Sequence, residues 1–241
     1  MSPFSLEGRT ALVTGANTGI GQAIAVALAQ AGAEVIAAGR RDCNETLALM
    51  GTGRSLQLDL SDPMAARGVF AGEPIDILVN NAGIIRRAEA VDFSVEDWDA
   101  VMDVNLKALF FTCQAFARVA LPRGRGKIIN VASLLSFQGG VRVASYTASK
   151  HGVAGLTKLM ANEWAASGLN VNAIAPGYIK TANTEALRAD VARERAIRER
   201  IPAGRWGRPE DIAQTAVFLA APASDYINGT VLNVDGGWLA R

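Results

Sequence analysis

Short apolar, β-branched runs alternate with amphipathic stretches along the whole chain. The run TALVT at 10–14 leads into glycines and then into AIAVALAQAG at 23–32, which has helical spacing and stops at Gly32. Six further runs read as strands, at 34–39, 55–60, 75–83, 127–133, 169–176 and 230–237. This alternation predicts an α/β fold with a parallel sheet covered by helices on both faces, in a single domain spanning 1–241.

Composition and charge narrow the class of partner. Basic residues number 24 and acidic residues 23, so no electrostatic footprint favours nucleic acid or an anionic membrane. The cysteines, Cys43 and Cys113, cannot build a disulfide framework, which fits a reduced, cytoplasmic setting. The N-terminus lacks the pattern of a signal peptide. The single histidine, His151, argues against a Ser-His-Asp hydrolase and a zinc site, and we expect no metal.

One polar segment interrupts the alternation. Residues 180–209 form a charged helix-and-loop stretch between two apolar strands. Most such runs are solvated surface helices, but the position in the chain favours a lid over the site.

The turn after the first strand has the composition of a phosphate cradle. TGANTGIGQA places Gly15, Gly19 and Gly21 between a strand and a helix, where backbone N–H groups and the helix N-terminus suit a pyrophosphate. The spacing is G-x-x-x-G-x-G rather than the G-x-G-x-x-G of most dinucleotide folds. A glycine-rich turn without a ligand remains the alternative.

The end of the second apolar run, AAGRRD, bears on the choice of cofactor. NAD sites usually carry an acid there, whereas this chain has Gly39 followed by Arg40 and Arg41, which suit a 2′-phosphate. NADP is therefore favoured. Asp42 keeps NAD open, and a solvated arginine pair is the remaining alternative.

Tyr146 and Lys150 lie four residues apart in SYTASKHG, a segment that reads as the start of a helix, so they share one face. A free phenol has a pKa of ~10 and needs it lowered by about two or three units to act as a base near neutral pH. A neighbouring ammonium, together with the positive nicotinamide of the cofactor, favours the phenolate. The pair therefore predicts proton transfer, against the alternative of a half-buried core tyrosine.

Together these segments resemble the short-chain dehydrogenase/reductase family. The resemblance runs through TGANTGIG (14–21), Asp59, NNAG (80–83), Asn105, Ser133, YTASK (146–150) and PG (176–177). It implies a doubly wound, Rossmann-type, seven-stranded parallel sheet and a nicotinamide cofactor. It also implies a catalytic set of Asn105, Ser133, Tyr146 and Lys150, in which Ser133 donates to the substrate oxygen and Asn105 links Lys150 to solvent. Ser133 could instead be only a helix cap.

The same resemblance implies the cofactor contacts. Asp59 and Leu60 would flank adenine, Lys150 would hold the ribose, and Ile179 and Thr181 would contact the carboxamide. Thr18 departs from relatives that carry a basic residue there, which leaves the 2′-phosphate mainly to Arg40. The expected set is Gly15, Asn17, Thr18, Gly19, Ile20, Gly21, Arg40, Arg41, Asp59, Leu60, Asn81, Ala82, Gly83, Tyr146, Lys150, Pro176, Gly177, Ile179 and Thr181.

Within the family, the chain after residue 75 resembles the 2-deoxy-D-gluconate 3-dehydrogenases, also called 2-dehydro-3-deoxy-D-gluconate 5-dehydrogenases. Gluconate 5-dehydrogenases are nearly as similar, and 3-oxoacyl-carrier reductases share the general pattern. A sensor that binds NADP without turnover is the alternative of another class. The resemblance also implies a homotetramer, with the apolar tail VLNVDGGWLA as one interface.

A sugar-acid substrate brings a carboxylate, which a guanidinium would bind. Arg86 and Arg87 follow the NNAG turn, and Arg142 lies between Ser133 and Tyr146. We expect Arg86 first and Arg142 second, with Ser133, Tyr146 and Gln138 completing the substrate site; solvated surface arginines are the alternative.

Overall fold

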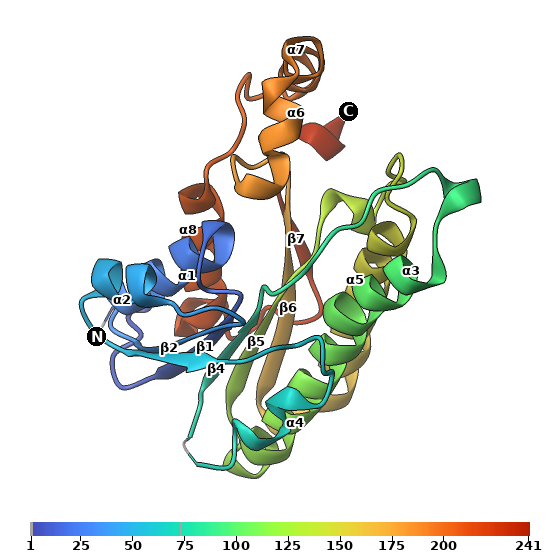
Figure 1. Cartoon of the computed structure of the whole chain (residues 1–241). Helices are drawn as coiled ribbons and strands as arrows, with labels where there is room; N and C mark the ends of the chain where they lie inside the picture. The colour runs from blue at the N-terminus through green and yellow to red at the C-terminus, as the bar shows by residue number, and fades with distance from the viewer. Residues whose placement is uncertain (1, 73) are drawn as a thin grey trace.

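The computed structural model describes residues 2–72 and 74–241 and contains one sheet of seven parallel strands (Figure 1). The strand order is β3-β2-β1-β4-β5-β6-β7, so the chain starts in the middle and winds outward in both directions. The strands are β1 (Thr10–Thr14), β2 (Glu34–Gly39), β3 (Arg54–Gln57), β4 (Ile77–Asn80), β5 (Gly126–Val131), β6 (Leu169–Pro176) and β7 (Val231–Val234). The predicted doubly wound sheet is confirmed.

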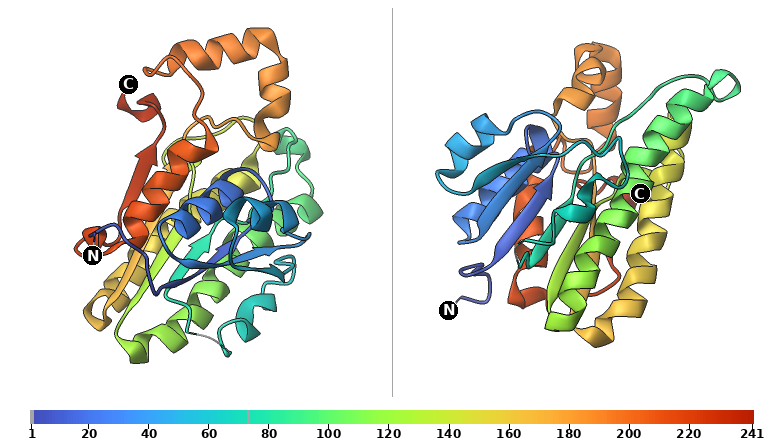
Figure 2. Two further views of the ribbon diagram at one scale, coloured as in Figure 1. Left: turned by 90° about the vertical axis from the view of Figure 1, so that its left-hand side faces the viewer. Right: turned by 60° about the horizontal axis from the view of Figure 1, so that its bottom comes forward.

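Helices cover both faces of the sheet (Figures 1 and 2). On one face lie α1 (Gly19–Gln30), α2 (Asn44–Met50) and α8 (Pro209–Ala220), and on the other α3 (Val95–Met102), α4 (Leu109–Ala120) and α5 (Ala144–Trp164). Each face has its own hydrophobic cluster, one between the sheet and α1 and α8, the other between the sheet and α4 and α5. A sheet covered on both faces requires continuously apolar strands, and seven of the eight residues of β6 are buried.

The predicted strand boundaries hold for β1, β2 and β6 and are too long for β3, β4 and β7. At β3 the run was expected to reach residue 60, but pairing with β2 ends at Gln57. Leu58 and Leu60 stay buried beyond the ladder. An apolar run therefore marks burial, which continues past the last paired residue.

The continuous helical run Val95–Arg123 is long and apolar enough, by length and composition, to suit a membrane span. In the fold it is a core helix, because Leu109, Cys113 and Phe116 are buried against the sheet. A π-helical turn, Asp103–Ala108, lies inside this run.

The polar segment forms α6 (Glu185–Ala189) and α7 (Val191–Arg200), which stand beyond the sheet at the top of Figure 1. A small apolar cluster beneath them includes Ile197, Trp206 and Trp238. Trp238 packs under the guanidinium of Arg200, 3.9 Å from the ring centre. The C-terminal residues thus hold this segment in place.

Candidate active site

A cleft lies at the carboxyl ends of the parallel strands, where open α/β sheets bind ligands. It consists of two adjoining cavities. The outer one, about 520 Å³, is lined by residues at the ends of β1, β2 and β4, including Gly39, Arg40 and Asp59. The inner one, about 290 Å³, reaches Val131, Tyr146, Lys150 and Thr181. The cavities share Gly15, Asn17, Arg41, Ala82, Gly83 and Ile84, so they form one elongated site.

The glycine turn after β1 is packed too tightly for side chains. Gly15 has a φ of +63°, and a Cβ there would lie 2.9 Å from the Cα of Ala82. A Cβ at Gly21 would overlap the carbonyl of Gly15. Helix α1 begins after Thr18 with no side-chain cap and no acid in its first turn. Its N–H groups are therefore available to an anion such as a pyrophosphate.

Thr14 joins the floor of the two cavities. Its hydroxyl donates to the carbonyl of Val79 at 3.3 Å and accepts from the backbone N–H groups of Asn81 and Ala82, each at 3.1 Å. The Asn81 amide in turn donates to the carbonyls of Thr14 and Gly15. The ends of β1 and β4 are thereby fixed to one another.

The part of the outer cavity next to the end of β2 carries positive charge, and β2 ends on a glycine rather than on an acidic residue. Arg40 and Arg41 both line it, next to Gly39. A Cβ at Gly39 would lie 3.0 Å from the carbonyl of Arg41 and 3.3 Å from the Asn17 side chain. The backbone of Ser61 and the charge of Arg40 both lower the pKa of Asp59. The geometry therefore suits a phosphate more than a free ribose hydroxyl.

Tyr146 and Lys150 line the inner cavity, and Ser133 lies near the phenol of Tyr146. Helix α5 presents Tyr146 and Lys150 one turn apart, and the ammonium lies 5.5 Å from the centre of the phenol ring. Lys150 is 4% exposed, and its ammonium donates to the carbonyl of Val131 at the end of β5. The Ser133 hydroxyl lies close enough to the phenol to lower the pKa of Tyr146. It also accepts from the Leu135 N–H, so Ser133 is a cap as well.

Burial shifts the pKa values of Tyr146 and Lys150, an effect that the sequence did not predict. Burial raises the pKa of Tyr146 above its usual value, while Ser133 and the charge of Arg87 oppose the rise. Burial lowers the pKa of Lys150 to about 8. Burial thus opposes the phenolate in the cofactor-free chain, and the phenolate expected with a bound nicotinamide stays a prediction.

Asn105 lies in the π-helical turn and is 1% exposed. Its amide oxygen accepts from the Ile84 N–H at 2.8 Å, and its nitrogen donates to the Ile84 carbonyl at 2.9 Å and to the Ser149 hydroxyl at 3.4 Å. π-turns of this kind often occur at functional sites. Asn105 thus holds the loop after β4 against α5, and its direct contacts are with Ile84 and Ser149 rather than with Lys150.

The three arginines near the site have different surroundings. Arg86, ranked first, lines the outer cavity and pairs with Asp97 at 3.0 Å. Arg142, ranked second, pairs with Glu89 at 3.2 Å and is 56% exposed. Arg87 donates to the carbonyl of Asn183, which lines the inner cavity, and its charge acts on Tyr146. The ranking of Arg86 before Arg142 therefore stays a prediction, and Arg87, which contacts Asn183, is a further candidate.

Some of the remaining expected cofactor and substrate residues line the cleft, and others lie elsewhere. Thr181 lines the inner cavity, with Asn17, Thr18, Gly19, Ile20 and Asn81. The Ile179 side chain is buried against Gly207, and Gly177 lines a separate cavity near Asp235, so their contacts with the carboxamide stay a prediction. Pro176 ends β6. Gln138 accepts from the Trp238 indole at 3.2 Å, so its amide oxygen is already engaged.

Comparison with known proteins places this arrangement in a family. A family model described as enoyl-(acyl carrier protein) reductase matches residues 15–239. A 2-dehydro-3-deoxy-D-gluconate 5-dehydrogenase from Bacillus subtilis (strain 168) is 60% identical, over 99% of this chain and 97% of the relative. This chain belongs to the short-chain dehydrogenase/reductase family.

Solved structures of short-chain dehydrogenases agree. One described as a 2-deoxy-D-gluconate 3-dehydrogenase from Agrobacterium tumefaciens, with bound NADP, is 69% identical with a TM-score of 0.99, and both chains are fully covered. Another, described as an NAD(P)-dependent gluconate 5-dehydrogenase from Beutenbergia cavernae with bound NADP, is 51% identical with a TM-score of 0.97, again over both full chains.

Some features of this short-chain dehydrogenase site were not predicted. Thr14 precedes the glycine turn, and only its place at the end of a strand beside NNAG could have indicated its role. Asn183 enters the site from the polar segment, with no sequence signal beyond that segment's position. Successive residues of an extended loop point in opposite directions, so the sequence could not say that Arg86 would line the outer cavity while Arg87 contacts Asn183.

Proposed function

We propose that this chain is an NADP-dependent dehydrogenase that acts on a secondary alcohol or ketone of a deoxy or keto sugar acid, of the 2-deoxy-D-gluconate 3-dehydrogenase type. The observation that carries the proposal is that Tyr146 and Lys150, with Ser133 near the phenol, line a cavity continuous with the one that holds Arg40. The relatives named above, two of them solved with NADP, support the substrate class and the cofactor.

The residues of the cleft fit NADP. The glycine turn and the N-terminus of α1 would receive the pyrophosphate, Arg40 and Arg41 the 2′-phosphate, and Lys150 the nicotinamide ribose. When bound, NADPH would supply the hydride for ketone reduction and NADP⁺ would accept it in alcohol oxidation. Ser133 would donate to the substrate oxygen, and the protonated phenol of Tyr146 would give that oxygen a proton in ketone reduction. In alcohol oxidation Tyr146 would take the proton, for which the ammonium of Lys150 must lower its pKa.

The substrate carboxylate would bind Arg87. This guanidinium has no carboxylate partner among residues 2–72 and 74–241, and it bridges the loop after β4 and the segment carrying Asn183. Residues 180–209, with α6 and α7, would serve as the lid. A carboxylate bound there would also connect the lid to the reacting centre.

The test of the function is the change in NADPH absorbance when purified protein is mixed with cofactor and a panel of sugar acids and keto acids. The alcohols, 2-deoxy-D-gluconate and D-gluconate, are tested with the oxidised cofactor, and the ketones, including a 3-oxoacyl thioester, with the reduced one. We expect turnover on the deoxy or keto sugar acid, with NADP(H) preferred over NAD(H). Cofactor binding without turnover on any member of the panel would instead support a sensor.

We further propose a homotetramer in the cytoplasm. Large apolar side chains remain exposed on the helices of one face and on the edge strand: Trp98 is 39%, Leu159 45% and Leu232 36% exposed. Surfaces of this kind commonly mark contacts between subunits. Light scattering during size-exclusion chromatography should give a mass close to four times 25.3 kDa.

A further inference from the structure

A further cavity, of about 490 Å³, lies away from the cleft, at the edge of the sheet where the strands begin. Its lining comes from the residues at or just before β1, β4, β5 and β6 and from the loop before β7. A strand of five to six residues spans ~17–20 Å. A ligand in this cavity would therefore touch neither the cofactor nor the substrate.

The charges in this cavity do not balance. The carboxylate of Asp76 is 5% exposed, and its Oδ1 is shared by Arg123 at 2.6 Å, Arg125 at 3.4 Å and Arg9 at 3.9 Å. Arg123 is the nearest and the least exposed of the three, so it neutralises the carboxylate. Arg9 and Arg125 have no other ion-pair partner in the described part of the chain. Two guanidinium charges are thus in excess on one wall.

Lys127 lies beside them as the cation of an ion pair. Its ammonium pairs with Asp225 at 2.7 Å, and its side chain is only 13% exposed. Burial lowers the pKa of Lys127, and so does the charge of Arg9, which is therefore close enough to repel it. An anion between these groups would relieve that repulsion.

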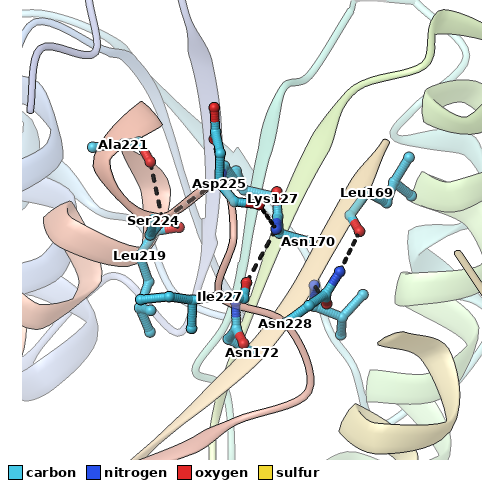
Figure 3. Close-up of polar contacts among 11 residues, drawn as sticks. Lys127, Leu169, Asn170, Asn172, Leu219, Ala221, Ser224, Asp225, Ile227 and Asn228 are labelled. Carbon is cyan, nitrogen blue, oxygen red and sulfur yellow. Dashed lines mark hydrogen bonds and ion pairs between the residues drawn. The ribbon is translucent and has the colours of Figure 1, made fainter. Parts of the chain in front are cut away.

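The opposite wall is held rigidly. Figure 3 shows Asn170 beside Lys127 and the loop carrying Asp225 and Ile227. The Asn170 amide donates to the carbonyls of Asp225 and Ile227, at 2.9 and 3.0 Å, and Asn228 donates to the Leu169 carbonyl at 2.9 Å. The cavity is therefore formed before any ligand arrives, and binding would cost little ordering of the chain.

We propose that this cavity binds a phosphate group, free or as a small phosphate ester, between Arg9 and Arg125. A planar guanidinium binds phosphate through two parallel N–H donors, and two such groups match a dianion. The volume leaves room for the rest of a small ester. Because the site is remote from the cleft, phosphate bound here would stabilise the fold without competing with substrate or NADP.

The test is the thermal unfolding of the full chain saturated with NADP, so that Arg40 is already occupied. Phosphate replaces chloride at constant ionic strength. We expect the unfolding midpoint to rise by about 3 °C once phosphate exceeds its dissociation constant tenfold. A parallel titration with glycerol 3-phosphate distinguishes the source: an equal or larger rise identifies an ester site, and a rise with inorganic phosphate alone identifies free phosphate.

Two variants and a control locate the effect. Arg9→Gln with Arg125→Gln should abolish the rise, and Arg125→Gln alone should at least halve it. Arg118→Gln, an exposed arginine on α4, should keep it. Because Arg125 is 59% exposed, its single variant should fold normally. No rise beyond chloride in the parent, or the same rise in the Arg125→Gln and double variants, would overturn the proposal.

Discussion

The ammonium of Lys150 lies 5.5 Å from the centre of the Tyr146 ring and donates to the carbonyl of Val131. One side chain thus connects the end of β5 with the proposed proton donor on α5. The site therefore depends on a buried cation, and removing this charge from water lowers the stability of the fold.

That loss should be visible in the pH dependence of stability. The pKa of Lys150 is about 8 in the folded chain against 10.5 ordinarily. Between these values the unfolded chain binds more protons, so the free energy of unfolding rises with pH. The free energy of unfolding of the cofactor-free parent and of Lys150→Met is measured by urea unfolding. Between pH 7 and 9.5 the free energy of unfolding of the parent should rise by ~2 kcal/mol relative to that of the variant. A difference that stays constant with pH would show that Lys150 is not desolvated.

Tyr146→Phe should lower turnover by more than a hundredfold and leave NADPH binding nearly unchanged. The substitution removes the proposed acid and base but little of the cofactor contact. Steady-state kinetics and NADPH fluorescence titration give the two values. Tyr226→Phe is the matched control, because Tyr226 is fully exposed. Activity of Tyr146→Phe within tenfold of the parent would exclude the assignment.

Arg40→Ala should weaken NADPH binding by ~1.5–3 kcal/mol, the usual contribution of a hydrogen bond to a charged group. NADH lacks the 2′-phosphate, so its affinity should remain near that of the parent. Isothermal titration with both cofactors makes the comparison, with Arg118→Ala as the control. An equal loss for NADPH and NADH would mean that Arg40 supports the loop rather than the phosphate.

Arg87→Gln should raise the KM for the sugar acid by roughly tenfold to a hundredfold, which corresponds to ~1.4–2.7 kcal/mol. Neutral ketones should be spared, because they bring no carboxylate. Arg86→Gln is the matched control, since its guanidinium already pairs with Asp97. Comparable losses on acidic and neutral substrates would show that Arg87 acts only by holding Asn183 in place.

Arg241→Ala should loosen the proposed lid. The Arg241 guanidinium donates to the carbonyls of Glu199 and Arg200, at 2.8 and 3.0 Å, at the end of α7. Hydrogen exchange should become faster in residues 191–200 and stay unchanged in α1. Unchanged exchange in 191–200 would show that the apolar cluster under Trp238 suffices.

The sequence predicted the structure best where only one type of residue is physically possible. The glycines of the first turn were identified because no other residue fits there, and the strands because a doubly covered sheet needs continuous apolar runs. The direction of a side chain on an irregular segment was not predictable. Arg86 and Arg87 are chemically alike, and only the path of the loop after β4 gives them different partners, Asp97 and Asn183.

The effect of burial on the pKa values of Tyr146 and Lys150 was not predictable for a related reason. Helical spacing places Lys150 on the same face, but it says nothing about the solvent that the fold removes from both groups. In the structure that loss of water raises the pKa of Tyr146 and lowers that of Lys150. Desolvation depends on distant packing, which no local motif records.

The hydroxyl of Thr14 has a consequence for the entropy of cofactor binding. It joins the glycine turn after β1 to the Asn81–Ala82 turn after β4, so these two walls are already one rigid body before a ligand arrives. Ordering of the chain on binding then falls mainly to the opposite wall, built from the segment after β6. The calorimetric signature of cofactor association should accordingly be governed by α6 and α7, while the glycine turn contributes contacts at almost no loss of conformational freedom.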